Sequence, residues 1–81
     1  MQKYDYSLLR GRIRELFKSE SNFAKELRKS DISLSTGGFN NKINGRSYFT
    51  QPEIEMICKL LRIPLLEVSK YFFVLKYELN S

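Results

Sequence analysis

The 81-residue sequence contains no histidine and a single cysteine, Cys58. One thiol cannot form a disulfide scaffold, and without histidine the chain lacks the Cys/His ligand set of a zinc finger. Histidine is also the commonest general base in enzymes, and without it Cys58 has no partner for nucleophilic catalysis. Residues 36–38 and 44–47 do not match a phosphate-cradling G-x-x-x-x-G-K-[ST] loop. We therefore expect no metal site, no cofactor, no small-molecule substrate and no enzymatic activity.

Long apolar segments are missing as well. Residues 1–14 lack the apolar stretch of a secretory signal. The longest uncharged apolar run near the end, residues 71–75, is far too short to cross a bilayer. A single cysteine without a secretory signal fits a reducing compartment. These absences predict one small cytoplasmic domain that makes no contact with a membrane.

The positive charge lies in one half of the chain. The net charge is +5: residues 1–46 hold ten Lys and Arg against five Asp and Glu, whereas residues 47–81 hold four of each. One-sided charge is typical of a surface that binds a polyanion, although many soluble proteins carry a similar excess. Arg10, Arg14 and Lys18 form a basic stripe in this half, which we interpret either as a solvated face or as a phosphate contact.

The spacing of apolar residues predicts five helices, at residues of about 4–18, 21–29, 36–45, 51–62 and 64–71. In the first, Leu9, Ile13 and Phe17 recur at helical spacing. The fourth is expected to begin with a capping box, because Thr50 is followed three residues later by Glu53. The predicted fold class is therefore all-α, in a single domain that spans residues 1–81.

The tail, residues 72–81, is rich in aromatic and branched residues and alternates in part, so it is read as a strand as readily as a helix end. A lone strand in a helical domain has nothing in its own chain to pair with, and the expected partner is the same strand of a second copy. The residues expected at this dimer interface are Tyr71, Phe72, Phe73 and Leu75. The aromatic members of this set are equally compatible with a place in the core.

Five short helices with a compact pair in second and third place resemble the Cro/repressor helix-turn-helix proteins, most closely the small phage-type regulators of Gram-positive bacteria. The segments that carry the resemblance are "YSLLRGRIRELF", "FAKEL", "FNNKINGR", "FTQPEIEMICKLLRIPLLEV" and "YFF". The resemblance covers nearly the whole chain. It implies a DNA-binding domain, usually dimeric, that controls transcription in the cytoplasm of a bacterial host.

The third predicted helix fits a recognition helix. Phe39 and Ile43 are four residues apart and supply one apolar edge, while asparagines project elsewhere. An asparagine can bond adenine bidentately in the major groove. By the resemblance, the base-reading residues are Thr36, Gly37, Asn40, Asn41 and Asn44. The residues implied to contact phosphates are Ser21, Lys25, Ser35, Lys42, Arg46, Ser47, Tyr48 and Gln51.

The sequence departs from the family pattern at three places. The connection before the third helix is about five residues longer than usual and lacks the usual glycine. Glu20 stands where the family often has a phosphate-touching glutamine, and a carboxylate would repel phosphate. Gly37 and Gly38 disfavour a helix where the third one should begin. Either that helix begins only at Phe39, or the bare backbone approaches another group closely.

These features predict a transcriptional regulator, of phage or prophage repressor type, that binds a twofold-symmetric DNA operator as a homodimer. A second hypothesis, favoured by the long connection, by Glu20 and by the paired glycines, is a small antirepressor or modulator that binds a partner phage repressor. A third is a general binder of nucleic acid, including RNA.

Overall fold

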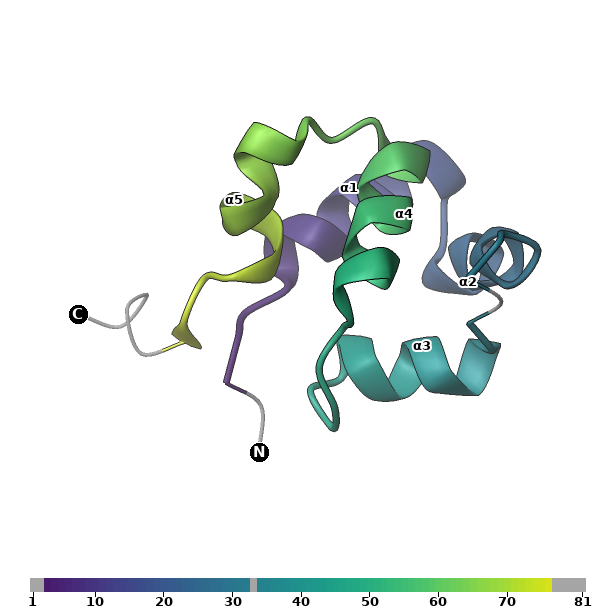
Figure 1. Ribbon diagram of the computed structural model, residues 1–81, viewed down its shortest axis with the longest axis horizontal. Coiled ribbons are helices and arrows are strands. Elements are labelled where there is room, and N and C mark those ends of the chain that lie inside the picture. The colour runs from purple at the N-terminus through teal and green to yellow at the C-terminus, as the bar shows by residue number, and fades with distance from the viewer. Residues whose placement is uncertain (1–2, 33, 77–81) are drawn as a thin grey trace.

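The computed structural model describes residues 3–32 and 34–76, which form five α-helices and one 3₁₀ turn. These elements are α1 (Ser7–Phe17), α2 (Glu20–Arg28), α3 (Thr36–Ile43), α4 (Gln51–Leu61), η1 (Leu65–Glu67) and α5 (Val68–Phe72). In Figure 1, α1 lies behind α4, α3 crosses below α4, and α2 and α5 lie on opposite sides. The described residues contain no strand element, so the prediction of an all-α fold is confirmed.

Local signals explain where the helices begin and end. Ser19 caps α2 by accepting the Asn22 N–H at 3.0 Å. Thr50 and Glu53 form the capping box expected at the start of α4. The first helix begins at Ser7 rather than near residue 4, because the Asp5 carboxylate accepts the Ser7 N–H at 2.7 Å.

The core is built around a chain of aromatic rings. Phe23, Phe39 and Phe72 are fully buried and come from three different helices. Consecutive ring centroids are 5.1 to 6.1 Å apart, and most of the pairs meet edge to face. In chain order these rings are Phe17, Phe23, Phe39, Phe49 and Phe72. Such pairs contribute about 0.5–1.5 kcal/mol each beyond the burial of their area. The rings therefore join α1, α2, α3, the segment before α4, and α5 into one core.

The expectation that the tail has no partner in its own chain is wrong for the residues described. Tyr4 and Leu75 form an antiparallel bridge. The Asp5 N–H donates to the carbonyl of Val74 at 2.7 Å, and the Lys76 N–H donates to the carbonyl of Lys3 at 3.1 Å. The N-terminal segment thus provides the partner that had been assigned to a second copy. Residues 77–81 of the predicted strand lie outside the described part of the chain.

None of the described helices has both the length and the apolar character needed to span a bilayer.

The aromatic chain predicts that Phe39 is critical for stability. Phe39→Ala should lower the free energy of unfolding by about 3–5 kcal/mol, since the lost ring leaves a cavity between α2 and the segment before α4. Urea unfolding followed by circular dichroism measures the change. Leu8→Ala is the matched control: Leu8 is 53% exposed, so its loss should shift the free energy by at most about 0.5 kcal/mol. Similar urea midpoints for the two variants would contradict the conclusion that Phe39 is critical for stability.

Candidate functional site

The outer face of α3 is polar and uncharged. Phe39 and Ile43 are buried in the core, whereas Asn40, Asn41 and Asn44 are exposed. The two apolar anchors and the three amides therefore lie on different sides of one short helix. Of the other two residues implied to read bases, Gly37 is exposed and Thr36, the first residue of α3, is half-buried.

The helix begins at Thr36, so the alternative in which it starts only at Phe39 is wrong. Ser35 is the N-cap: its hydroxyl accepts the Gly38 N–H at 3.0 Å. A Cβ added at Gly38 would lie 3.0 Å from Leu34 Cδ1, whereas one at Gly37 would meet nothing within 4 Å. The close approach that the paired glycines suggested is therefore made by Gly38 alone, against Leu34 of the same chain.

Arg10 of α1 joins the N-terminus of α2 to the C-terminus of α3. Its guanidinium donates to both carboxylate oxygens of Glu20, at 2.8 and 2.7 Å. It also donates to the Ile43 carbonyl at 3.0 Å and to the side-chain oxygen of Asn44 at 2.9 Å. Arg14 lies 3.4 Å from the same Glu20 carboxylate. Glu20 is therefore neutralised by two cations, which corrects the expectation of a free carboxylate that repels phosphate.

Sequence reasoning missed this role of Arg10. The residue was assigned to a basic stripe, but its side chain is 27% exposed and that of Glu20 is 21% exposed. Arg10 is part of a polar cluster under the end of α3, whereas Arg14 and Lys18 stay on the exposed face. The spacing of charges along α1 carries no signal for this difference, because Glu20 lies on the next helix.

Lys42 holds α3 to the start of α4. Its ammonium donates to both carboxylate oxygens of Glu53, at 2.6 and 2.7 Å, and the two side chains are 16% and 12% exposed. Burial alone would raise the pKa of Glu53, but the hydrogen bonds from Lys42 and from the Thr50 N–H outweigh it, so the pKa of this carboxyl lies below its ordinary value. Lys42 was predicted to contact phosphate; the structure instead gives its ammonium a partner inside the protein.

The exposed residues implied to contact phosphates form two groups on either side of α3. The group on α2 consists of Ser21 and Lys25, and the group beyond α3 consists of Arg46, Ser47, Tyr48 and Gln51. Ser35 is also exposed, although its hydroxyl already caps α3. Arg46 is held against the helix, since its guanidinium donates to the side-chain oxygen of Asn41 at 3.2 Å. The ring of Tyr48 packs edge to face against Tyr4, with centroids 5.9 Å apart. A ligand that approaches α3 can meet the exposed side chains of the remaining members, which are Ser21, Lys25, Ser47 and Gln51.

The residues predicted at a dimer interface do not lie together on the surface. Phe72 is 1% exposed and belongs to the core, while Tyr71 and Leu75 are half-buried. Of these four residues, only Phe73 is exposed. The ring of Phe72 belongs to the core because α5 directs it towards Phe49.

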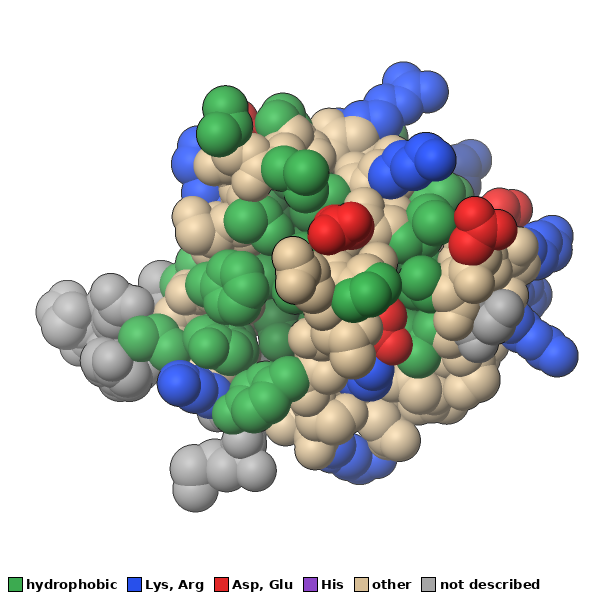
Figure 2. Space-filling model, viewed as in Figure 1, with side chains coloured by type: hydrophobic (Ala, Val, Ile, Leu, Met, Phe, Trp, Pro, Cys, Tyr) green, Lys and Arg blue, Asp and Glu red, His purple; other side chains and the backbone are tan. Residues whose placement is uncertain are grey.

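An apolar surface lies over η1, α5 and the adjoining part of α4. Its exposed members are Tyr48, Leu65, Leu66 and Phe73. Figure 2 shows hydrophobic side chains gathered over α5, η1 and the adjoining part of α4. A hollow of about 470 Å³ is lined by Phe49, Gln51, Ile54, Glu55, Leu65, Val68 and Phe73. We refer to the four exposed residues and this hollow as the apolar surface.

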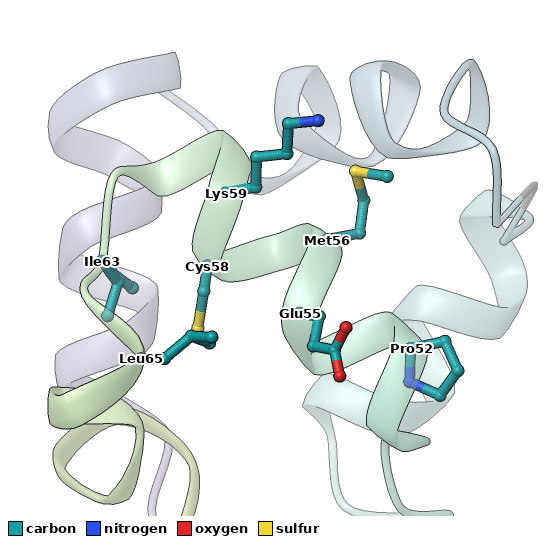
Figure 3. Close-up of a pocket in the computed structure, with 7 residues that line it drawn as sticks. All are labelled: Pro52, Glu55, Met56, Cys58, Lys59, Ile63 and Leu65. Carbon is teal, nitrogen blue, oxygen red and sulfur yellow. The ribbon is translucent and has the colours of Figure 1, made fainter.

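A second hollow, of about 370 Å³, opens between α4 and η1 and shares Leu65 and Glu55 with the first. In Figure 3 the sulfur of Cys58 points towards Leu65, at the inner wall of this hollow. Burial raises the pKa of the Cys58 thiol, which keeps it in its neutral form. Across residues 3–32 and 34–76, no three His, Cys, Asp or Glu side chains are grouped so as to hold a metal ion.

The ion pair between Lys42 and Glu53 makes the free energy of unfolding depend on pH. Because the folded-state pKa of Glu53 is lowered, its contribution is complete above the ordinary value of 4.5 and is lost as the pH falls through the folded-state pKa. Glu53→Gln should lower the free energy of unfolding by about 1–3 kcal/mol at neutral pH and flatten its fall in acid. Urea unfolding at a series of pH values measures both effects, with the exposed Glu26→Gln as control. Parallel pH curves for Glu53→Gln and the wild type would contradict the assignment.

Comparison with known proteins identifies a family. No curated protein matches the chain. A protein-family model described as "Protein of unknown function (DUF739)" matches residues 2–74. The matched segment begins before α1 and ends after α5, so it includes all the helices described above. The chain belongs to the DUF739 family.

Proposed function

We propose that the protein is a sequence-specific double-stranded DNA-binding regulator of transcription, of the Cro/repressor helix-turn-helix type. The observation that carries this proposal is the two-sided character of α3, which is anchored by Phe39 and Ile43 and exposes three asparagines. Amides reach base edges in the major groove and read donor and acceptor patterns there. A short helix with an uncharged polar face suits this task better than it suits contact with solvent alone.

Contacts at the C-terminal end of α3 support the proposal, because base reading needs a helix in a fixed position. The usual connection between the two helices of this motif is a turn of about three or four residues. Here residues 29–35 separate α2 from α3, and so long a connection constrains their angle less. The constraint comes instead from Arg10, which bonds both Glu20 of α2 and the Ile43 carbonyl of α3. The ion pair of Lys42 with Glu53 also ties α3 to α4.

Charge supports a polyanionic partner. Lys25 and Arg28 are exposed on α2, the helix that precedes α3. Cations placed beside a recognition helix contact phosphates and fix its register on the duplex. Since Arg10 and Lys42 are paired inside the protein, fewer cations are available for phosphates than the net charge suggests. We therefore expect a moderate dependence of DNA affinity on salt.

We further propose that two copies bind one operator through the apolar surface. This surface carries both a protruding Leu66 and a hollow, as an isologous contact between identical copies requires. Glu55 and Lys59 line the adjoining hollow, so a twofold axis can pair opposite charges across it. In Figure 1, α5 and η1 lie at the upper left and α3 at the bottom, so a second copy packed on this surface leaves α3 uncovered. Two recognition helices about 34 Å apart match one turn of the duplex.

The exposure of Leu66 also favours the second candidate function. A modulator that binds a partner phage repressor needs an apolar contact surface of its own, and the same residues provide one. The two functions differ in what occupies the surface. A regulator pairs with a second copy and retains DNA binding, whereas a modulator binds the partner repressor and has no operator.

Base reading and phosphate contact predict different effects of substitution. Asn40→Ala should lower the preference for a site selected from random duplexes by about 5- to 100-fold. Lys25→Ala should weaken all duplexes alike and lower the slope of log affinity against log salt by about 0.9. Fluorescence anisotropy over a range of salt concentrations measures both, with Lys70→Ala, an exposed lysine of α5 that lines neither hollow, as control. Equal affinity of the wild type for random duplexes and single strands would instead favour a general nucleic-acid binder.

The apolar surface predicts the oligomeric state. Leu66→Lys should prevent pairing and reduce operator affinity by at least about tenfold, because the second copy multiplies the affinity of the first. Sedimentation velocity with and without DNA measures the change, and Leu8→Lys, on the exposed face of α1, is the control. One wild-type copy per symmetric duplex at saturation would contradict this part of the proposal. Capture of a repressor protein by a wild type that binds no duplex would favour the modulator.

A further inference from the structure

The exit from α3 turns the chain back on the helix. Gly45 has a φ of 83°, in the left-handed region that favours glycine. The Arg46 N–H donates to the Asn41 carbonyl at 2.9 Å, and the Gly45 N–H donates to the Lys42 carbonyl at 3.0 Å. This pair of bonds is the Schellman pattern of a helix C-terminus. It brings Arg46 back beside the exposed face of α3.

The Arg46 side chain follows the same direction. Its guanidinium donates to the side-chain oxygen of Asn41 at 3.2 Å. Because Asn41 is exposed among the amides of α3, the hydrogen bond places the guanidinium on the face that we assign to base reading. A phosphate contact would need the guanidinium at the edge of that face.

The hydrogen bond also changes what Asn41 offers to a base. An asparagine that reads adenine must accept from N6 and donate to N7 at the same time. One lone pair of the Asn41 oxygen accepts from Arg46, so the guanidinium lies on the acceptor side of this amide, and the amide nitrogen keeps both of its donors. The guanidinium has further N–H groups, all of them donors. Asn41 and Arg46 together therefore present donors to the groove.

Asn40 differs in this respect. Its side chain is exposed and makes no hydrogen bond with any other part of the chain that the structure describes. It keeps both an acceptor and a donor, which is the pattern that adenine requires. The acceptor of Asn40 is thus fully available to a base, whereas the acceptor of Asn41 is shared with Arg46.

We propose that Asn41 and Arg46 act as a unit that reads a guanine in each half-site, and that Arg46 determines specificity instead of contacting phosphate. Guanine is the base whose major-groove edge presents two acceptors, N7 and O6, to such a set of donors. The Asn41 oxygen holds the guanidinium in place before binding, which lowers the entropy lost when it meets the base. This inference rests on the DNA-binding function proposed above and names the sequence element that the site prefers.

The experiment compares Arg46→Ala and Arg46→Lys. A half-site is first selected from random duplexes with the wild-type protein, and each of its guanines is then replaced in turn by 7-deazaguanine, which removes only the N7 acceptor. The wild type should lose about 5- to 100-fold in affinity at one guanine. Both variants should bind the parent duplex and this 7-deazaguanine duplex almost equally. Lysine keeps the charge but lacks the fork of a guanidinium, so it should not restore the preference.

The possible results separate this inference from the proposed function. If Arg46→Lys restores affinity and both variants retain the wild-type loss at 7-deazaguanine, Arg46 contacts phosphate and the inference is overturned while the function stands. If the selection enriches no sequence, both are overturned. Asn41→Ala provides an internal check, because it should remove most of the same guanine preference. Circular dichroism of each variant verifies that α3 is still folded.

Discussion

The position of α3 depends on the packing of Phe39 between Phe23 and Phe49. These three rings join α3 to α2 and to the segment before α4, and Phe72 extends the contact to α5. An 81-residue domain has a small core, so a few large rings supply a large share of its buried area. Because Phe39 is both a core ring and the anchor of α3, the stability of the domain and the geometry of the polar face are coupled.

The ion pairs add direction to this packing. Burial of rings is largely non-directional, whereas a guanidinium that bonds a carboxylate at two points fixes orientation. Arg10 bonds the C-terminal end of α3, and Lys42 ties the same helix to the capping box of α4. Both cations come from the basic half of the chain. Part of that charge therefore serves the internal geometry of the protein, and the surface that faces a partner is less basic than the sequence suggests.

Much of the fold could be predicted from local patterns. The all-α class followed from apolar spacing, and the start of α4 followed from Thr50 and Glu53, because capping depends on residues that are neighbours in the sequence. The pairing of residues 3–5 with residues 74–76 could not be predicted in this way, since two short segments at opposite ends carry no local signal for each other. The partners of Arg10 and Lys42 could not be predicted either, because they lie on other helices. In the candidate site, the exposed amides followed from the spacing of Phe39 and Ile43, whereas the hydrogen bond of Asn41 depends on the geometry of the turn.

The pairing between the two ends of the chain has a consequence for how the protein folds. Tyr6 packs against Phe49, Phe49 packs against Phe72, and the residues after Phe72 bond to those before Tyr6. Contacts between distant parts of a chain close slowly, because a long loop must be ordered first. During synthesis the core that includes Tyr6 and Phe49 therefore stays incomplete until residues 72–76 have been added to the chain.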